Sequence, residues 1–337
     1  MHYLVTGHTG FKGSWLVLLL NRLGHTVSGI SLDPQKNSLF ELANVAGILE
    51  HDFRIDIRDK QALQNAINII KPDVVMHLAA QALVRESYIN PRFTFETNAI
   101  GTLNVLESVH NENNVKATLI ITTDKVYRNV DQPEGYKEDD PLGGDDPYSS
   151  SKAMADLLTQ SWVKSFPGSP VAIARAGNVI GGGDVCTDRL IVDLIKGFES
   201  AEPILIRYPK AVRPWQHVLD CLAGYLQIVD DLLAGPQRTT WNIGPLETSF
   251  ISVGEMADEA VSYWGERVSW IKDPRIHPHE ANLLMLDATN ARNMLNWGDK
   301  VPYPQSLYWT LDWYKQVAHG KSPIETSLQQ LSNFLSL

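Results

Sequence analysis

The chain opens with an apolar run that leads directly into a glycine-rich turn, since residues 3–13 read YLVTGHTGFKG. Gly7, Gly10 and Gly13 stand at a GxxGxxG spacing, which predicts a strand, a tight turn and the start of a helix. Glycines there let the backbone approach a pyrophosphate, while the amides of the helix N-terminus face the anion. A glycine-rich turn without a ligand is the alternative interpretation. The residues expected to hold a dinucleotide are Gly7, Thr9, Gly10, Phe11, Lys12 and Gly13.

Short apolar runs alternate with longer amphipathic stretches through the first half of the chain. The apolar runs lie near residues 3–6, 26–31, 51–57, 74–77, 117–123 and 171–175. Strands that are apolar almost throughout are typical of a parallel sheet that helices cover on both faces. The pattern therefore predicts an α/β fold, a doubly wound parallel sheet of the Rossmann type, over residues 1–177.

The rhythm becomes less regular after NVIGGGD, at residues 178–184. Short strands are expected near 204–207 and 241–243, and helices near 189–199, 218–234 and 253–264. We predict a smaller, mainly C-terminal substrate-binding lobe at 178–337, with residues 215–245 returning to the first domain. Because no linker or internal repeat separates the two lobes, we expect them to share one interface.

Composition and charge argue against several classes of partner. The 337 residues are 44% apolar and 20% charged, an ordinary profile for a soluble globular protein. A net charge of −10 without a basic run argues against nucleic acid. The apolar run at 15–20 is too short to span a bilayer, and Cys186 and Cys221 show no metal-ligand spacing. We expect a cytoplasmic protein that binds neither nucleic acid nor membranes.

One histidine-rich stretch raises the question of a metal site. HPHE places His277, His279 and Glu280 close together in a proline-containing loop. A histidine pair two residues apart, without a third ligand at a clear spacing, is more typical of a structural or substrate-facing loop. We predict no metal.

A carboxylate follows the second predicted strand. Asp33 lies where an acidic side chain accepts hydrogen bonds from the adenosine ribose hydroxyls in dinucleotide-binding folds, which favours NAD over NADP. An ordinary turn residue before Pro34 is the alternative interpretation.

Two further stretches carry ionisable groups where parallel strands end. In DPYSSSK, residues 146–152, Tyr148 and Lys152 stand four residues apart, on one face of a helix. An ammonium near the phenol, helped by a positive nicotinamide, would lower the tyrosine pKa and make it a general base. TTDK at 122–125 ends the preceding strand, so Asp124 can converge with Tyr148 at the carboxyl edge of the sheet. An exposed helix start and a solvent-facing turn are the respective alternatives.

The motifs together resemble those of a known family, the extended short-chain dehydrogenase/reductases. They are TGHTGFKG (6–13), HLAAQALVRESYINP (77–91), TNAIGT (97–102), TTDKVY (122–127), GYKEDDPLGGDDPYSSSK (135–152), ARAGNVIGGGD (174–184), DRLIVD (188–193) and RPWQHV (213–218). Within that family the chain is most similar to the nucleotide-sugar 4,6-dehydratases that act on CDP-glucose. The resemblance implies NAD as the cofactor and a nucleotide-diphosphate sugar, CDP-glucose above all, as the substrate.

The resemblance also implies roles for individual residues. Tyr148 would take the C4 hydroxyl proton of the sugar, Thr123 would hydrogen-bond that oxygen, and Asp124 would donate a proton to the departing C6 hydroxyl. The implied catalytic set is Thr123, Asp124, Lys125, Tyr148 and Lys152. Further cofactor contacts are expected from Asp56, Ile57, Leu78, Ala79, Ala80, Asn98 and Thr122, besides Tyr148 and Lys152. Substrate contacts are expected from Arg85, Ser87, Asn178, Arg189, Arg207, Arg213 and His217. Arginine forks suit a diphosphate, although each arginine could instead form a surface ion pair.

Lys125 stands where related dehydratases have a glutamate that acts as the C5 base. A charged lysine cannot accept a proton, so either Lys125 is neutral or another group or a water does that work. A nucleotide-sugar 4-epimerase, a dehydratase of another nucleotide sugar and a non-catalytic NAD-binding regulator remain open as alternatives. Relatives pair the helices corresponding to 99–110 and 149–162 into a four-helix bundle, so we expect a homodimer.

Overall fold

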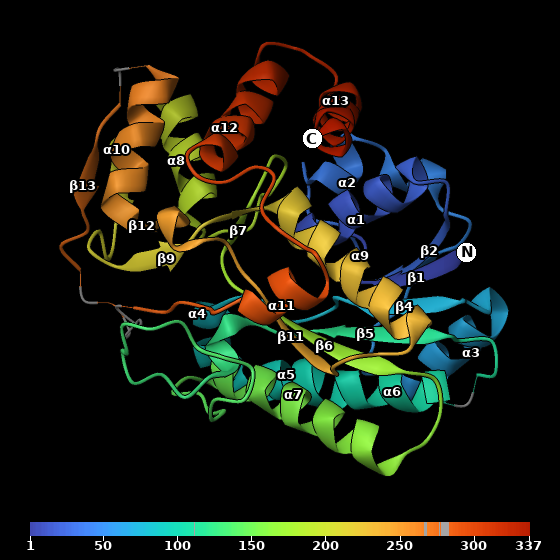
Figure 1. Cartoon of the computed structure of the whole chain (residues 1–337). Coiled ribbons are helices and arrows are strands. Elements are labelled where there is room, and N and C mark those ends of the chain that lie inside the picture. Colours follow the sequence, from blue (N-terminus) through green and yellow to red (C-terminus); the bar gives the residue numbers. More distant parts are fainter. Residues whose placement is uncertain (111, 266–267, 276, 278–282) are drawn as a thin grey trace.

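The computed structural model describes residues 1–110, 112–265, 268–275, 277 and 283–337. Its centre is a seven-stranded sheet in the order β11-β6-β5-β4-β1-β2-β3, in which all neighbouring strands run parallel (Figure 1). The strands are β1 (His2–Thr6), β2 (Thr26–Ser31), β3 (Asp52–Arg54), β4 (Val74–His77), β5 (Ala117–Ile121), β6 (Val171–Ala176) and β11 (Thr240–Ile243). The predicted doubly wound parallel sheet is therefore confirmed.

Helices cover both faces of this sheet (Figure 1). One face carries α1 (Phe11–Arg22) and α9 (Val218–Ala234), and the other carries α3 (Lys60–Ile70), α6 (Gly101–His110) and α7 (Pro147–Ser165). Within β1, Tyr3 and Val5 join the core under α1 and α9, whereas Leu4 joins the core under α3 and α6. Successive side chains of a strand point to opposite faces, so two covered faces require apolar residues at every position.

The remaining elements are short or lie around the edges of the sheet. The helices are α2 (Leu39–Leu42), α4 (Val84–Ile89), α5 (Pro91–Phe95), α8 (Leu190–Ser200), α10 (Val253–Trp264), α11 (Thr289–Met294), α12 (Gln305–Ala318) and α13 (Pro323–Ser336). A π turn spans Glu96–Ile100, and 3₁₀ turns span Val45–Ile48, Asp124–Val126 and Glu247–Ser249. The short strands are β7 (Val179–Ile180), β8 (Ile204–Ile206), β9 (Val212–Pro214), β10 (Gln216–His217), β12 (Phe250–Ser252) and β13 (Trp270–Lys272).

A second hydrophobic cluster lies beside the sheet and is built from α8, α10 and α12 (Figure 1). Leu194 of α8, Met256 of α10 and Leu311 of α12 are among its buried members. Two small sheets, β8 with β13 and β9 with β12, lie next to it. The later part of the chain also returns to the main core, through α9, β11 and the C-terminal helix α13. A division into two domains at residue 177 stays a prediction.

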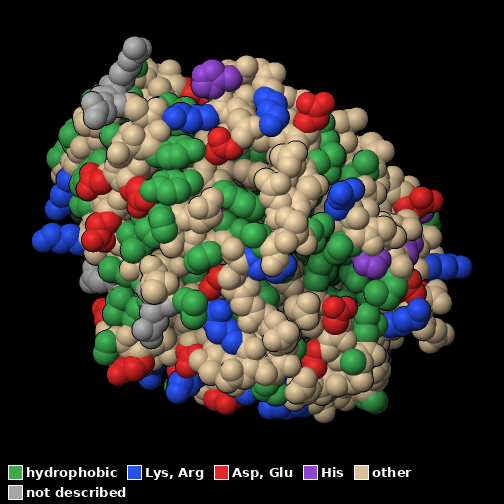
Figure 2. Space-filling model, turned by 45° about the horizontal axis from the view of Figure 1, so that its top comes forward, with side chains coloured by type: hydrophobic (Ala, Val, Ile, Leu, Met, Phe, Trp, Pro, Cys, Tyr) green, Lys and Arg blue, Asp and Glu red, His purple; other side chains and the backbone are tan. Residues whose placement is uncertain are grey.

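Charged and apolar side chains are intermixed on the face shown in Figure 2, so neither sign of charge forms a continuous patch there. In the described ranges, no helix combines the length and apolar character that crossing a membrane requires.

Candidate active site

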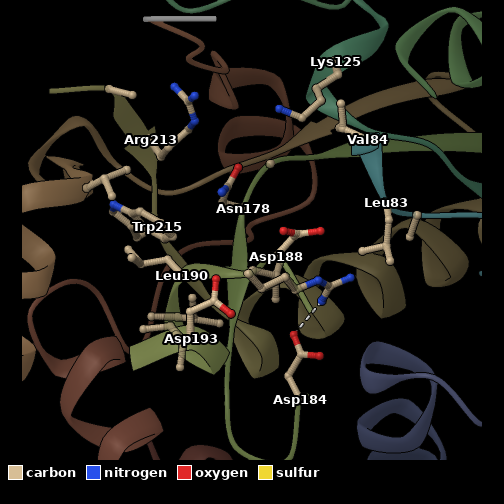
Figure 3. Close-up of a pocket in the computed structure, with 18 of the residues that line it drawn as sticks. Leu83, Val84, Lys125, Asn178, Asp184, Asp188, Leu190, Asp193, Arg213 and Trp215 are labelled. Atoms are coloured by element: carbon tan, nitrogen blue, oxygen red, sulfur yellow. Dashed lines mark hydrogen bonds and ion pairs between the residues drawn. The ribbon is translucent and has the colours of Figure 1, made fainter. Parts of the chain in front are cut away.

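A cavity of about 330 Å³ lies at the carboxyl edge of the central sheet, next to the second hydrophobic cluster (Figure 3). This volume is at the lower end of the range typical of small-molecule sites. Its lining joins the end of β5 and the start of α7 to the segments that begin α8 and follow β8. The predicted site residues that line it are Phe11, Lys12, Arg85, Thr122, Thr123, Asp124, Lys125, Tyr148, Asn178, Arg189, Arg207 and Arg213.

Thr123 and Asp124 follow the end of β5, where the chain turns into a single 3₁₀ turn. Thr123 Oγ1 donates to Asp124 Oδ1 over 2.9 Å and accepts the amide of Lys125 at 3.4 Å. The Asp124 side chain is buried, and its Oδ2 has no hydrogen-bond partner among the described residues. Because an unpaired buried carboxyl oxygen is costly, this atom is ready to bind a group that enters the cavity.

Tyr148 is the second residue of α7, and the start of that helix fixes its position. Asp146 caps the helix by accepting the amide of Ser149 over 3.0 Å, and Pro147 occupies the first turn. The amide of Tyr148 donates to Ser87 Oγ over 3.1 Å. Burial raises the pKa of Tyr148 to about 12, although a hydrogen bond with the Thr123 side chain opposes this rise. The phenol is therefore protonated at neutral pH in the free protein.

Lys152 lies one turn further along α7. Its ammonium donates to the backbone oxygen of Ile121 over 2.8 Å. Burial, and then repulsion from Lys12, lower the pKa of Lys152 to about 7. In the free protein, burial dominates the phenol, and the lysine is itself only partly charged near pH 7. The expected lowering of the tyrosine pKa by Lys152 and a positive nicotinamide concerns the NAD-bound state and stays a prediction.

A buried ion pair that sequence reasoning missed lies beneath the end of β5. Arg175 of β6 donates two 2.8 Å bonds to the carboxylate of Asp156, and both side chains are almost fully buried. The same carboxylate accepts the hydroxyl of Thr122 over 3.1 Å, which links α7 to the residue before Thr123. Asp156 follows Lys152 by four residues, so its place on the same helix face was readable from the sequence.

The glycine turn forms a cradle that fits a pyrophosphate. Gly7 has φ of +74°, and a Cβ there would meet the Ala79 amide nitrogen at 2.7 Å. A Cβ at Gly13 would lie 2.2 Å from the Gly7 oxygen. Helix α1 begins after Gly10, and this N-cap glycine has no side chain to cap the first amides of the helix. Uncapped amides at a glycine-lined helix start suit a diphosphate, so the residues present fit the NAD that the motif predicts.

Predicted cofactor residues beyond this turn lie along the same edge of the sheet. The amides of Leu78 and Ala79 donate to the backbone and side-chain oxygens of Thr6, over 3.1 and 3.2 Å respectively. Asn98 exchanges hydrogen bonds with the backbone of Gln81, which follows Ala80. Its amide also donates to Ser151 Oγ over 2.8 Å and so connects this loop to α7.

The residues expected to bind the adenosine part of NAD differ in exposure. The Asp33 side chain is 89% exposed and lies 3.5 Å from Arg54 Nε, a residue that we did not predict. Arg54 is also held by Asp52, through bonds of 2.5 and 2.8 Å. The side chain of Asp56 pairs with Arg58 at 2.6 Å. Ile57 is buried, with its Cδ1 2.5 Å from where a Cβ on Gly101 would lie.

Two predicted substrate residues do not line the cavity. Ser87 is buried, and its hydroxyl donates to the oxygen of Val84 while accepting the Tyr148 amide. His217 is fully buried, caps α9 by accepting the Leu219 amide at 3.3 Å, and has a pKa lowered to about 3 by burial. Both side chains support the backbone around the site.

The arginines predicted to bind substrate carry internal partners. Arg189 pairs with Asp184 at 2.6 Å, and Arg85 and Arg207 both approach Asp188, at 2.7 and 3.2 Å. None of these aspartates was predicted as a site residue. Figure 3 shows Asp184, Asp188 and Asp193 around one part of the cavity and Lys125 and Arg213 around another, with Asn178 between them.

Within the described ranges, no group of three His, Cys, Asp or Glu side chains could hold a metal ion. Of the histidine-rich stretch, His277 lines the cavity, while His279 and Glu280 lie outside the described residues. Cys186 and Cys221 form no disulfide.

Comparison with known proteins places this geometry in a family. Residues 3–244 match the NAD dependent epimerase/dehydratase family. CDP-glucose 4,6-dehydratase of Salmonella typhimurium is 41% identical to this chain, over 98% of this chain and 95% of its own length. UDP-glucuronic acid 4-epimerase of Bacillus cereus, solved with UDP-glucuronic acid and NAD, has a TM-score of 0.81 at 24% identity and covers 94% of this chain and 100% of its own.

A second solved structure has the same fold. The dTDP-glucose 4,6-dehydratase of Bacillus anthracis in complex with NAD has a TM-score of 0.80 at 22% identity, with 96% of this chain and 99% of that chain covered. At such identities the two solved structures show the fold alone. The family match and the Salmonella relative carry the assignment further and confirm the resemblance seen in the motifs. The chain belongs to the NAD dependent epimerase/dehydratase family.

Proposed function

We propose that this protein is an NAD-dependent nucleotide-sugar 4,6-dehydratase that converts CDP-glucose into CDP-4-keto-6-deoxyglucose. The observation that carries the proposal is the buried carboxyl of Asp124, which lies beside Thr123 at the end of β5 with one oxygen unpaired among the described residues. The 41% identical relative named CDP-glucose 4,6-dehydratase supports the choice of nucleotide and sugar.

The side chains divide the proton transfers between them. Tyr148, hydrogen-bonded to Thr123, takes the proton of the C4 hydroxyl after losing its own, which the positive nicotinamide of bound NAD would favour, and Thr123 holds that oxygen in place. NAD, when bound, supplies the hydride acceptor for C4 and the hydride donor for C6. A C4 ketone acidifies the C5 proton, and Asp124 in its protonated form donates to the departing C6 hydroxyl. The buried carboxyl of Asp124 and the phenol of Tyr148 therefore transfer protons at different oxygens of the sugar.

Removal of the C5 proton needs a base, which would return that proton to C5 when hydride reaches C6. Lys125 lines the same cavity and follows Asp124 directly. It can act as that base only in its neutral form, so a water or another group takes the proton wherever Lys125 stays charged. The glycine turn of β1 and α1, with Lys152 on α7, would hold the cofactor at the edge of the sheet.

A nucleotide-sugar 4-epimerase is the second candidate, because one of the solved structures of this fold is an epimerase. An epimerase has no need of an acid at Asp124. The deciding experiment incubates the protein with NAD and CDP-, dTDP-, UDP- or GDP-glucose and assays the alkaline-induced absorbance of a 4-keto product. A 4-keto-6-deoxy product with CDP-glucose supports the proposal, whereas a C4 epimer without that absorbance contradicts it. A 4-keto-6-deoxy product from another nucleotide sugar would support a 4,6-dehydratase with a different substrate.

Assembly, location and lobe division belong to the same proposal. We infer a homodimer through α6 and α7, because three large apolar residues are about half exposed there: Ile100, directly before α6, at 48%, and Met154 and Leu157 of α7, at 47% and 54%. The cytoplasm suits an enzyme that uses NAD and a nucleotide sugar.

A cofactor-binding part over 1–177 and a substrate-binding part over 178–337, with 215–245 returning to the first, would leave the cavity between them.

A further inference from the structure

Two arginines of the cavity meet at one carboxylate. Arg85 of α4 donates to Asp188 Oδ1 over 2.7 Å, and Arg207, which follows β8, lies 3.2 Å from the same oxygen. Arg207 also donates to the backbone oxygen of Asp188 over 3.2 Å. All three residues line the cavity, and their side chains are 51%, 33% and 25% exposed for Arg85, Asp188 and Arg207. The carboxylate thus connects segments that are far apart in the sequence, at the wall of the site.

The backbone presents Asp188 in an uncommon conformation. Its φ is +64°, in the left-handed region that residues other than glycine, asparagine and aspartate rarely adopt. The next residue, Arg189, is itself paired with Asp184 at 2.6 Å. Three guanidinium groups of this cavity are therefore held by the carboxylates of the protein itself.

We propose that Asp188 is an internal competitor for the substrate's diphosphate, which displaces its carboxylate from Arg85 and Arg207 on binding. This inference rests on the proposed function in taking a nucleoside diphosphate as the ligand of the cavity. Arginine forks bind phosphate oxygens and carboxylates through the same bidentate geometry. A diphosphate carries more negative charge than one carboxylate and can engage both arginines, so exchange favours it over uncharged ligands.

The consequence is a smaller difference in affinity between diphosphates and uncharged nucleosides. A neutral nucleoside cannot replace the carboxylate and leaves the Arg85–Asp188–Arg207 arrangement intact. A diphosphate gains two guanidinium partners but gives up part of that gain in breaking the existing ion pairs. Asp188 therefore lowers the affinity for every diphosphate while keeping the arginines paired in the free protein.

The test is calorimetric titration of the full-length wild type and Asp188→Asn with CDP, cytidine and inorganic pyrophosphate. Asparagine keeps the side-chain volume and tolerates positive φ, so the variant preserves the backbone. We expect Asp188→Asn to bind CDP and pyrophosphate about threefold to thirtyfold more tightly at low salt, the range that partly exposed ion pairs allow. Cytidine affinity should be unchanged, and added salt should reduce the gain.

Asp193→Asn is the matched control. Asp193 lines the same cavity and feels the charges of Arg85 and Arg207, but it forms no ion pair within the part of the chain that the structure describes, so its replacement removes a nearby carboxyl without breaking a direct contact to an arginine. A gain for Asp188→Asn that clearly exceeds the gain for Asp193→Asn supports the proposal. Equal gains for the two variants, or weaker CDP binding by Asp188→Asn, would overturn it, the latter by making Asp188 a positioning residue for the arginines.

The two proposals fail in different ways. Tighter pyrophosphate and CDP binding by Asp188→Asn, together with no 4-keto product from any nucleotide sugar, supports the role of Asp188 and contradicts the dehydratase. Formation of the 4-keto product, with no change in the CDP or pyrophosphate affinity of Asp188→Asn, supports the dehydratase and contradicts the role of Asp188.

Discussion

Thr123 Oγ1 donates a 2.9 Å hydrogen bond to Asp124 Oδ1, and the second oxygen of that buried carboxyl has no partner in the described part of the chain. This bond orients the carboxyl of Asp124. The hydroxyl of Thr123 also interacts with the phenol of Tyr148. Two proton carriers that share one hydroxyl can act on C4 and C6 of one sugar, the two carbons that flank C5. This relationship is the basis of the first two predictions.

Tyr148→Phe should abolish most turnover while leaving the fold intact. Loss of a positioned acid-base group typically costs at least about a hundredfold in rate. Initial rates of 4-keto product formation measure the effect, and NADH fluorescence checks that the cofactor still binds. Tyr88→Phe is the matched control, because Tyr88 lines the same cavity and is 45% exposed. Near wild-type turnover in Tyr148→Phe would contradict the assignment.

Asp124→Asn should separate oxidation from dehydration. The amide oxygen can still accept from Thr123, but the side chain has no acidic proton to give to the C6 hydroxyl. We expect NADH to accumulate on addition of CDP-glucose, with formation of the 6-deoxy product slowed by about a hundredfold or more. Thr123→Ser, which keeps the hydroxyl, should retain the full cycle. Unchanged product formation in Asp124→Asn would remove Asp124 from the acid role.

Lys125→Glu should alter the preference between the two forms of the cofactor. An ammonium near the nicotinamide repels the positive oxidised ring but not neutral NADH, by about 1 kcal/mol or roughly fivefold in affinity. We expect the variant to bind NAD more tightly with NADH affinity little changed, and Lys125→Met to give a smaller shift in the same direction. Calorimetric titration with both cofactor forms measures this. Equal shifts for NAD and NADH would show that Lys125 does not sense the ring charge.

Asp220 should make the protein less stable as the pH rises from about 4 to about 7. Burial raises the pKa of Asp220 from 3.8 to about 7, while its oxygens accept the amides of Lys300 and Val301 at 2.8 and 3.0 Å. Between these two pH values the folded state holds a proton that the unfolded state has lost, so raising the pH favours unfolding, by up to about 1.4 kcal/mol per pH unit.

The measurement is the free energy of unfolding by urea across that pH range. Asp220→Asn should flatten this part of the profile, because the variant has no titrating group at the site. A stability that rises between pH 4 and 7 by the same slope in both proteins would contradict the prediction for Asp220.

Leu157→Arg should dissociate the proposed homodimer. A charge in a covered apolar face would be left without solvent or a partner. Sedimentation at micromolar concentration should give a dimer for the wild type and a monomer for the variant. Leu328→Arg on α13, where the leucine is 38% exposed, is the control and should stay dimeric. A monomeric wild type would refute the dimer.

The sequence alone determined the architecture of the main sheet. Most of its first six strands were readable as short apolar runs, because a strand covered on both faces must be apolar at successive positions. The edge strand β3 differs, since its three residues, Asp52, Phe53 and Arg54, are partly exposed. The predicted ends were less accurate. The run at 117–123 yields a strand that stops at Ile121, and the chain enters a 3₁₀ turn at Asp124. The glycine turn and the Tyr148–Lys152 spacing were equally local signals, which depend on backbone conformation and helical period.

Tertiary structure alone decided the electrostatics and the partners of the site. No local pattern could show that burial would raise the pKa of Tyr148 to about 12, or that His217 would cap a helix instead of facing a ligand. Arg85 and Asp188 are 103 positions apart, and their contact depends on how the segment before α8 packs against α4. Local propensity acts over a few residues, whereas desolvation and ion pairing depend on which distant segments exclude water together, and only the folded chain determines that.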